Sequence, residues 1–199
     1  MLASQDVGDR IGEVVETSST GFTAQAYGVN GAAPLGSLVR TAGDGPVYAV
    51  VREVSTSSLD PGRRPVALGR DEPDEEAVYK NNPQISRLFR TDFDATIVGY
   101  GDGPEIRQHL PPQPPKIHAF IHACTPEDLA AFTQRLDFLP MLLSRPTPLA
   151  DQVTSAFLRQ AASARGDADA FLATAGRSLA RLLSRDYQRL TTLLRNLKP

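Results

Sequence analysis

Residues 35–54 read LGSLVRTAGDGPVYAVVREV, two apolar runs separated by a turn rich in glycine. The run 47–54 is rich in valine, a β-branched residue that favours strands, and the run 35–40 carries Leu35, Leu38 and Val39. Between them, Asp44-Gly45 tolerates the positive φ angles that a tight hairpin turn requires. The stretch therefore predicts two antiparallel strands, and it sets the pattern for the first two-thirds of the chain.

Other short strands are predicted on both sides of this hairpin. An alternating segment, Phe22–Tyr27, is preceded by Ile11–Glu16. A second Gly-Asp-Gly-Pro string, 101–104, joins Ala95–Tyr100 to Ile106–Leu110, and Lys116–Cys124 follows as a last strand. Short strands with glycine turns are typical of a barrel or a sandwich. We expect a six-stranded β-barrel over residues 8–124.

An insertion interrupts the predicted strands at about residues 71–90. It begins with the acidic run Asp71–Glu76 and continues with apolar residues at helical spacing. Pro83 disfavours helix at the preceding residue, so we expect one or two short helices. The acidic run lacks the spaced oxygen ligands and central glycine of a calcium loop, so we interpret it as a solvated helix start.

The chain after Cys124 changes to helical spacing. Thr125-Pro126 is a helix start signal, with a capping residue before proline at the first helical position. We expect three helices over residues 125–199, and the last, about Asp169–Leu197, carries a leucine at nearly every turn. The fold class is therefore α+β. The leucine spacing fits helices packed on the barrel and helices paired with a second copy of the chain equally well.

Composition and charge narrow the class of protein. Residues 1–124 hold 11 Lys and Arg against 16 Asp and Glu, whereas residues 125–199 hold 10 against 7. The near-neutral total excludes a strongly basic nucleic-acid binder, and the single cysteine excludes a disulfide framework. The first six residues lack a signal-peptide pattern and no apolar run is long enough to span a membrane, so we expect a cytoplasmic protein.

Catalytic and cofactor motifs are weak in this sequence. No glycine loop precedes a lysine, as phosphate binding by a P-loop requires, and we expect no cofactor. On a strand, His118 and His122 would lie about 13 Å apart, too far to share one metal ion, and His122 and Cys124 about 6.6 Å apart. We expect semi-exposed histidines, no metal and no catalytic residues. A hydrolase site around His109, His118 and the acidic insertion is the remaining enzymatic hypothesis.

The strongest candidate binding feature is basic. Five arginines follow one another along the predicted last helix: Arg177, Arg181, Arg185, Arg189 and Arg195. Steps of four residues drift slowly around a helix, so the arginines form a wide polar face opposite the leucines. This face could bind DNA or an acidic protein surface. The alternative is a solvated face in a protein that uses 18 arginines and 3 lysines.

The first strands resemble the HAS-barrel family. The strings that carry the resemblance are Ile11-Gly12-Glu13-Val14-Val15-Glu16, Phe22–Tyr27, Leu35-Gly36-Ser37-Leu38-Val39 and Tyr48–Val54. This barrel precedes the ATPase core of HerA-type DNA-translocating ATPases and of ATP synthase catalytic subunits. The resemblance implies a stand-alone barrel without that core, and no family catalytic residue falls on it.

Together these observations predict a non-catalytic interaction or adaptor module. The resemblance implies that its partner is a HerA-like hexameric ATPase or the associated nuclease in DNA processing. The alternative is a protein that binds DNA directly through the arginine-rich C-terminal helix, and a second copy of the chain is a further candidate partner.

Overall fold

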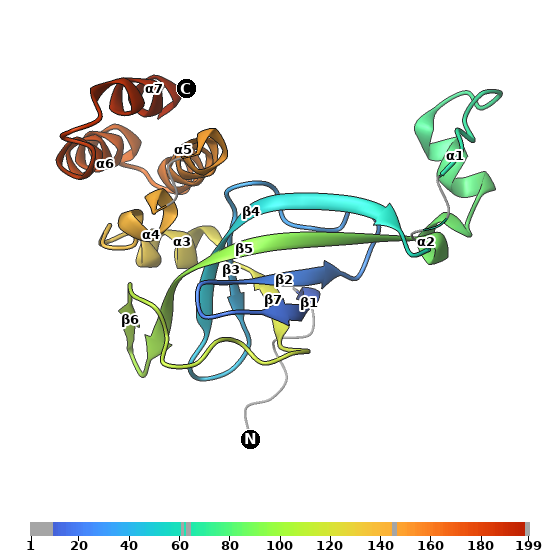
Figure 1. The fold of residues 1–199 in the computed structure, drawn as a ribbon, viewed down its shortest axis with the longest axis horizontal. Helices are drawn as coiled ribbons and strands as arrows, with labels where there is room; N and C mark the ends of the chain where they lie inside the picture. The colour runs from blue at the N-terminus through green and yellow to red at the C-terminus, as the bar shows by residue number, and fades with distance from the viewer. Residues whose placement is uncertain (1–9, 61, 63–64, 145–146, 198–199) are drawn as a thin grey trace.

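The computed structural model describes residues 10–60, 62, 65–144 and 147–197. The expected start of the barrel at residue 8 lies outside the described residues. Seven strands and seven helices are formed in the described part of the chain. Figure 1 shows a central barrel with helices gathered at one end and a long two-stranded projection at the other.

The predicted six-stranded barrel is confirmed as a closed antiparallel barrel. Its strands are β1 (Arg10–Thr17), β2 (Gly21–Ala26), β3 (Leu38–Thr41), β4 (Val47–Ser58), β5 (Phe89–Asp102) and β7 (Phe120–Ala123). Around the barrel they pair in the order β1, β2, β5, β4, β3, β7, and β7 returns to β1. β6 (Glu105–Arg107) forms a hairpin on β5 outside the ring. Closure satisfies the backbone groups that the edge strands of an open sheet would leave unpaired.

Both glycine turns form the hairpins predicted from them. Gly43 has φ of 100° in the turn between β3 and β4, and Gly103 has φ of 59° in the turn between β5 and β6. The strand predicted over Lys116–Cys124 is wrong in its first half. The backbone turns at residues 116–119, where the Ala119 N–H donates to the Lys116 carbonyl oxygen and His118 has φ of 64°. The regular ladder begins at Phe120 with β1 and at Ile121 with β3, although the His118 N–H already donates to the Val14 carbonyl oxygen at 2.8 Å.

The insertion is helical but shorter than expected. It contains α1 (Glu75–Asn81) and α2 (Ile85–Leu88), and the chain already enters β5 at Phe89. Phe89 and its successors pair with the far end of β4, which extends well past the barrel. The two strands form a projecting ribbon with the helices at its end (Figure 1).

The C-terminal region holds five helices where three were expected. They are α3 (Pro126–Phe132), α4 (Leu139–Leu143), α5 (Pro148–Ser163), α6 (Ala168–Leu182) and α7 (Tyr187–Leu197). The long last helix breaks after Leu182, and Asp186 accepts a hydrogen bond from the Arg189 N–H to start α7. The break lets two leucine-bearing halves pack against α5, which contacts both α6 and α7. A single straight helix could not present both halves to α5.

Two hydrophobic cores meet at the β3–β4–β5 wall. One fills the barrel interior and includes Val39, Ala49 and Ile97. The other lies outside the same wall and joins Leu38, Val50 and Val98 to the helices. An aromatic series crosses this second core, with Tyr48 against Phe132, Phe132 against Phe138 and Phe138 against Phe157, at centroid distances of 5.1 to 5.3 Å. The helices therefore pack on the barrel of their own chain.

Gly36 lies where the barrel meets α5. Its φ is 81°, and a Cβ added there would lie 2.7 Å from the Ala156 Cβ and 2.8 Å from the Phe157 nitrogen. The Gln160 side chain donates to the neighbouring Leu35 carbonyl oxygen at 2.9 Å. Only glycine fits this approach without moving the helix.

We expect Gly36→Ala to lower the free energy of unfolding by roughly 2–4 kcal/mol, because it adds overpacking to left-handed backbone strain. Gly43→Ala is the matched control, since Gly43 also has a positive φ but has open space where the Cβ would lie. It should lose only roughly 1–2 kcal/mol. Urea unfolding of both variants measures the difference, and equal losses would contradict the tight contact with α5.

Candidate interaction surfaces

The projecting ribbon, here called the arm, consists of Val54–Ser58 of β4 paired with Phe89–Phe93 of β5. One face of the arm is anchored near the barrel, where Phe93 and Thr91 are fully buried. The Thr91 hydroxyl lies 2.8 Å from the Thr56 hydroxyl and accepts a hydrogen bond of 3.0 Å from the Asn30 N–H. These contacts hold the root of the arm in a defined direction.

The segment at the end of the arm, residues 59–88, is here called the tip. Asp74 caps α1 by accepting from the Ala77 N–H at 2.8 Å, and the Asn81 amide donates to the Glu72 carboxylate at 2.8 Å. Neither tip helix contains a buried residue. The large apolar side chains that the tip exposes are Leu59, Val66, Leu68, Tyr79 and Leu88. Exposed apolar side chains gathered on one element mark an interaction site more often than isolated ones do.

The outer edge of the arm is open. Beyond Val51, β4 pairs with β5 alone among the described strands, whereas its earlier residues also pair with β3. Alternate residues of an antiparallel strand point their N–H and C=O groups away from the partner. This edge therefore offers backbone groups to which an extended chain could bind.

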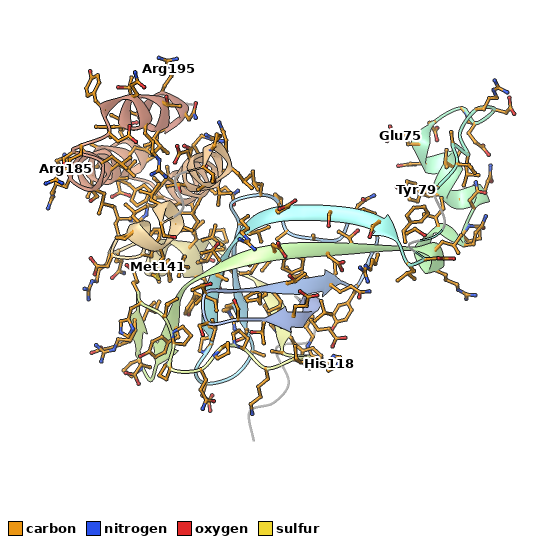
Figure 2. The ribbon with its side chains drawn as sticks, in the orientation of Figure 1. Glu75, Tyr79, His118, Met141, Arg185 and Arg195 are labelled. Carbon is orange, nitrogen blue, oxygen red and sulfur yellow. The ribbon has the colours of Figure 1, made fainter. Side chains whose placement is uncertain are left out.

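A groove runs between the barrel and the helices. Its volume is about 590 Å³, and its lining includes the β1–β2 turn and residues of α4 and α5 such as Met141 and Val153. A second hollow of about 490 Å³ lies beside the open edge of β4, and Arg52 and Leu149 line both. Helices α3 to α7 are here called the helical end, and Met141 is labelled in Figure 2 at its base.

The polar side chains at the groove are engaged with one another. Arg52 forms an ion pair of 3.2 Å with Asp94, whose other oxygen accepts a hydrogen bond of 2.6 Å from the Thr23 hydroxyl. The three side chains come from β4, β5 and β2 and tie these strands together on the outside of the barrel. In this arrangement the carboxylate and the guanidinium balance each other's charge, so the groove has no unpaired charge at this point.

The histidines and the cysteine lie apart. His118 sits on an exposed turn 3.6 Å from Glu13, and His109 packs against the edge of Tyr100. Figure 2 shows His118 on the barrel, far from Glu75 on the tip, so the insertion and these histidines do not form one site. Neither His109 nor His118 lines the groove or the second hollow.

The expectation of a semi-exposed His122 is wrong, because its side chain is fully buried. His122 lies on β7 between Arg10 of β1 and Arg40 of β3, so neighbouring strands cover both of its sides. The Cys124 thiol is also largely enclosed, and burial raises its pKa to about 12, which keeps it protonated at neutral pH. Among the residues that the structure describes, no three His, Cys, Asp or Glu side chains are grouped to hold a metal ion.

The five predicted arginines do not form one continuous face. Arg177 and Arg181 lie on α6, Arg185 lies in the turn after it, and Arg189 and Arg195 lie on α7. Four of them are exposed, and Figure 2 shows Arg185 and Arg195 at the outer boundary of the helical end. The break between α6 and α7 replaces the predicted stripe with a basic surface spread over two helices.

Arg189 has a structural role that the sequence pattern did not indicate. It forms an ion pair of 2.7 Å with Asp151 at the start of α5, and each side chain is only 13% exposed. Its Nε donates to the same carboxylate at 2.8 Å. Arg189 therefore holds α7 against α5 and does not contribute to the basic surface. The sequence signal for this break is Asp186, a good N-cap residue within an otherwise helical pattern.

No protein-family model and no curated protein matches the chain. No helix in the described ranges has the length and apolar character needed to cross a membrane.

Proposed function

We propose that this chain is a non-catalytic interaction module in which a closed barrel holds an arm and a helical end in fixed positions. The observation that carries the proposal is the tip, which exposes five large apolar side chains and buries none within its helices. Ordering a segment lowers its conformational entropy, and a segment that buries no side chains gains little free energy of folding to offset this loss. Binding to another protein surface would offset that cost.

The proposed partner is a HerA-like ATPase or its nuclease, and the proposed compartment is the cytoplasm. Support comes from the strings that resemble the HAS-barrel, because three of them fall on β1, β2 and β4 of a closed six-stranded barrel and the fourth leads into β3. Fold-level similarity is a general argument for function, so the partner must be tested directly.

Co-purification with a tagged HerA-type ATPase from the same organism tests this partner. We expect the wild-type chain to be retained, and Val66→Asp with Leu68→Asp to reduce retention at least about tenfold, because charge replaces apolar contact. Ile117→Asp is the control, since Ile117 is about as exposed as Leu68 but lies on the barrel. No retention of the wild-type chain, under conditions that retain the nuclease, would contradict the proposal.

The second candidate function is direct binding to DNA through α6 and α7. The observation that favours it is that Arg181, Arg185 and Arg195 are exposed and form no ion pair within the described part of the chain. Arginines of this kind remain available to phosphate oxygens.

Filter binding to duplex DNA tests this function. If the helices bind DNA, Arg181→Glu with Arg185→Glu should weaken binding and flatten the dependence of log affinity on log salt by about two phosphate contacts. Unchanged affinity and slope would rule it out. Lys116→Glu, an exposed site on the barrel, controls for the general loss of positive charge.

A further inference from the structure

The connector between β6 and β7, residues 108–119, is here called the strap. Its middle reads Leu-Pro-Pro-Gln-Pro-Pro-Lys over residues 110–116, so four of these seven residues are proline. Figure 1 shows the strap as a long stretch of irregular chain that runs along one side of the barrel, away from the tip. None of its four prolines lines the groove or the second hollow, so the strap is a separate surface.

Both ends of the strap are anchored to the body of the molecule. At one end, the Gln108 side chain accepts a hydrogen bond of 2.9 Å from the Asp137 N–H, in the turn between α3 and α4. At the other end, Pro115 is buried, and the His118 N–H donates to the Val14 carbonyl oxygen at 2.8 Å. These contacts fix where the segment between them lies on the surface.

Between the two anchors the strap is accessible. Pro111 is half-buried, and the exposed residues are Leu110, Pro112, Gln113, Pro114 and Lys116. No backbone hydrogen bond joins residues 110–115 to one another or to any other residue that the structure describes. A partner can therefore bind this segment without breaking backbone hydrogen bonds of the fold.

The prolines restrict the backbone of the strap to two short polyproline II halves. Proline fixes its own φ and confines ψ of the residue before it to the extended range. Within residues 111–115, the torsions that this leaves free are ψ of Pro112 and φ of Gln113. The chain bends at these two residues. Rotation about one peptide link would therefore align the two halves, and no backbone hydrogen bond opposes it.

When the halves are aligned, the spacing of the side chains suits a polyproline II ligand. This helix has about three residues per turn, so side chains three positions apart share a ridge. Leu110-Pro111 and Gln113-Pro114 then repeat one Xaa-Pro pair on the same side, and Lys116 follows one turn later. The ridge between them ends in Pro115, which is buried and holds this side toward the barrel.

Lys116 adds a charge to the end of the proline segment. Its side chain is exposed and makes no ion pair with any residue that the structure describes. In contrast, Arg107 before the strap is paired with Asp102 and Glu105. The segment therefore carries a single cation that is available to a carboxylate of another molecule.

We propose that the strap is a docking segment for a protein domain whose groove is lined by aromatic side chains and flanked by a carboxylate. Pro-rich segments with two prolines three positions apart bind grooves of this kind, because their conformation is largely set before binding and little entropy is lost. Pro111 and Pro114 would occupy the groove, and Lys116 would contact the carboxylate. This surface is additional to the tip and does not depend on it.

Calorimetric titration of the full chain with a proline-recognition domain tests the proposal. A panel of purified domains of this class is first screened with a synthetic peptide of residues 107–118, and a domain that binds the peptide and has an acidic pocket beside its groove is the probe. We expect the full chain to bind this domain within about tenfold of the peptide's affinity, because the strap is already accessible. A panel without a binder of the peptide, or a domain that binds the peptide but not the folded chain, would overturn the proposal.

Paired substitutions test which residues make the contact. Pro111→Ala with Pro114→Ala should weaken binding at least about tenfold, because both Xaa-Pro contacts are removed. Pro73→Ala with Pro104→Ala, two exposed prolines outside the strap, is the matched control and should bind like the wild-type chain. Urea unfolding establishes that both variants are folded. Equal binding by the two variants would overturn the assignment of the strap.

Two single substitutions test the mode of binding. Gln113→Pro fixes both free torsions in the polyproline II range, so it should raise the affinity by about two- to fivefold. Lys116→Glu should weaken binding, and Lys116→Arg should retain it, because the charge and not the side-chain length is required. An unchanged or lower affinity of Gln113→Pro, or binding by Lys116→Glu equal to that of the wild-type chain, would contradict this mode.

The tip variant separates this inference from the proposed function. Val66→Asp with Leu68→Asp should bind the proline-recognition domain like the wild-type chain, because the tip lies away from the strap (Figure 1). Retention on the ATPase should in turn be unchanged by Pro111→Ala with Pro114→Ala. Loss of domain binding in the tip variant would overturn the strap as the docking segment, whatever the outcome with the ATPase.

Discussion

Burial of both faces of β4 is the constraint on which the rest of the molecule depends. Val47, Ala49 and Val51 belong to the core inside the barrel, and Tyr48 and Val50 belong to the core beneath the helices. A strand covered on both sides needs an unbroken apolar run, and VYAVV supplies one. The helices must cover the outer face of this wall, because otherwise Tyr48, Val50, Leu38 and Val98 would be exposed to water.

The arm follows from the same strands. β4 has 12 residues and β5 has 14, whereas β3 and β7 have only four each. The two long strands therefore continue after the others have ended, and their burial falls off once neither helices nor neighbouring strands cover them. Beyond that point β4 and β5 are held only by pairing with each other. The loop that carries Asn30 contacts the start of the arm through Thr91. The tip is thus held at a distance from the body, where its exposed side chains can meet another molecule.

Local signals in the sequence predicted much of this fold. The two Gly-Asp-Gly-Pro turns, the Thr125 cap and the alternation in Phe22–Ala26 all depend on neighbours within a few residues, and all appear in the structure. The barrel was predicted as a class, but its closing contact, β2 with β5, joins residues about seventy positions apart and has no local signal. The burial of His122 likewise depends on strands that come together only in the folded chain.

The candidate site was predicted only in part. The arginines of the C-terminal region were identified, but the partner of Arg189 is Asp151, 38 residues earlier, and no spacing rule connects them. The acidic insertion was interpreted as a solvated helix start, which fits its exposure. Its position at the end of an arm, opposite the basic helices, arises from the length of β4 and β5 and could not be deduced from the insertion itself.

Native-state hydrogen exchange tests the central structural claim, that barrel and helices share one wall and the arm stands outside it. We expect the amides of Val47–Val51 and of α5 to exchange only through global unfolding, and the α1 amides to exchange orders of magnitude faster. If the α5 amides exchanged through a local opening of much lower free energy than the opening that exposes β4, the helices and the barrel would not share one core at this wall.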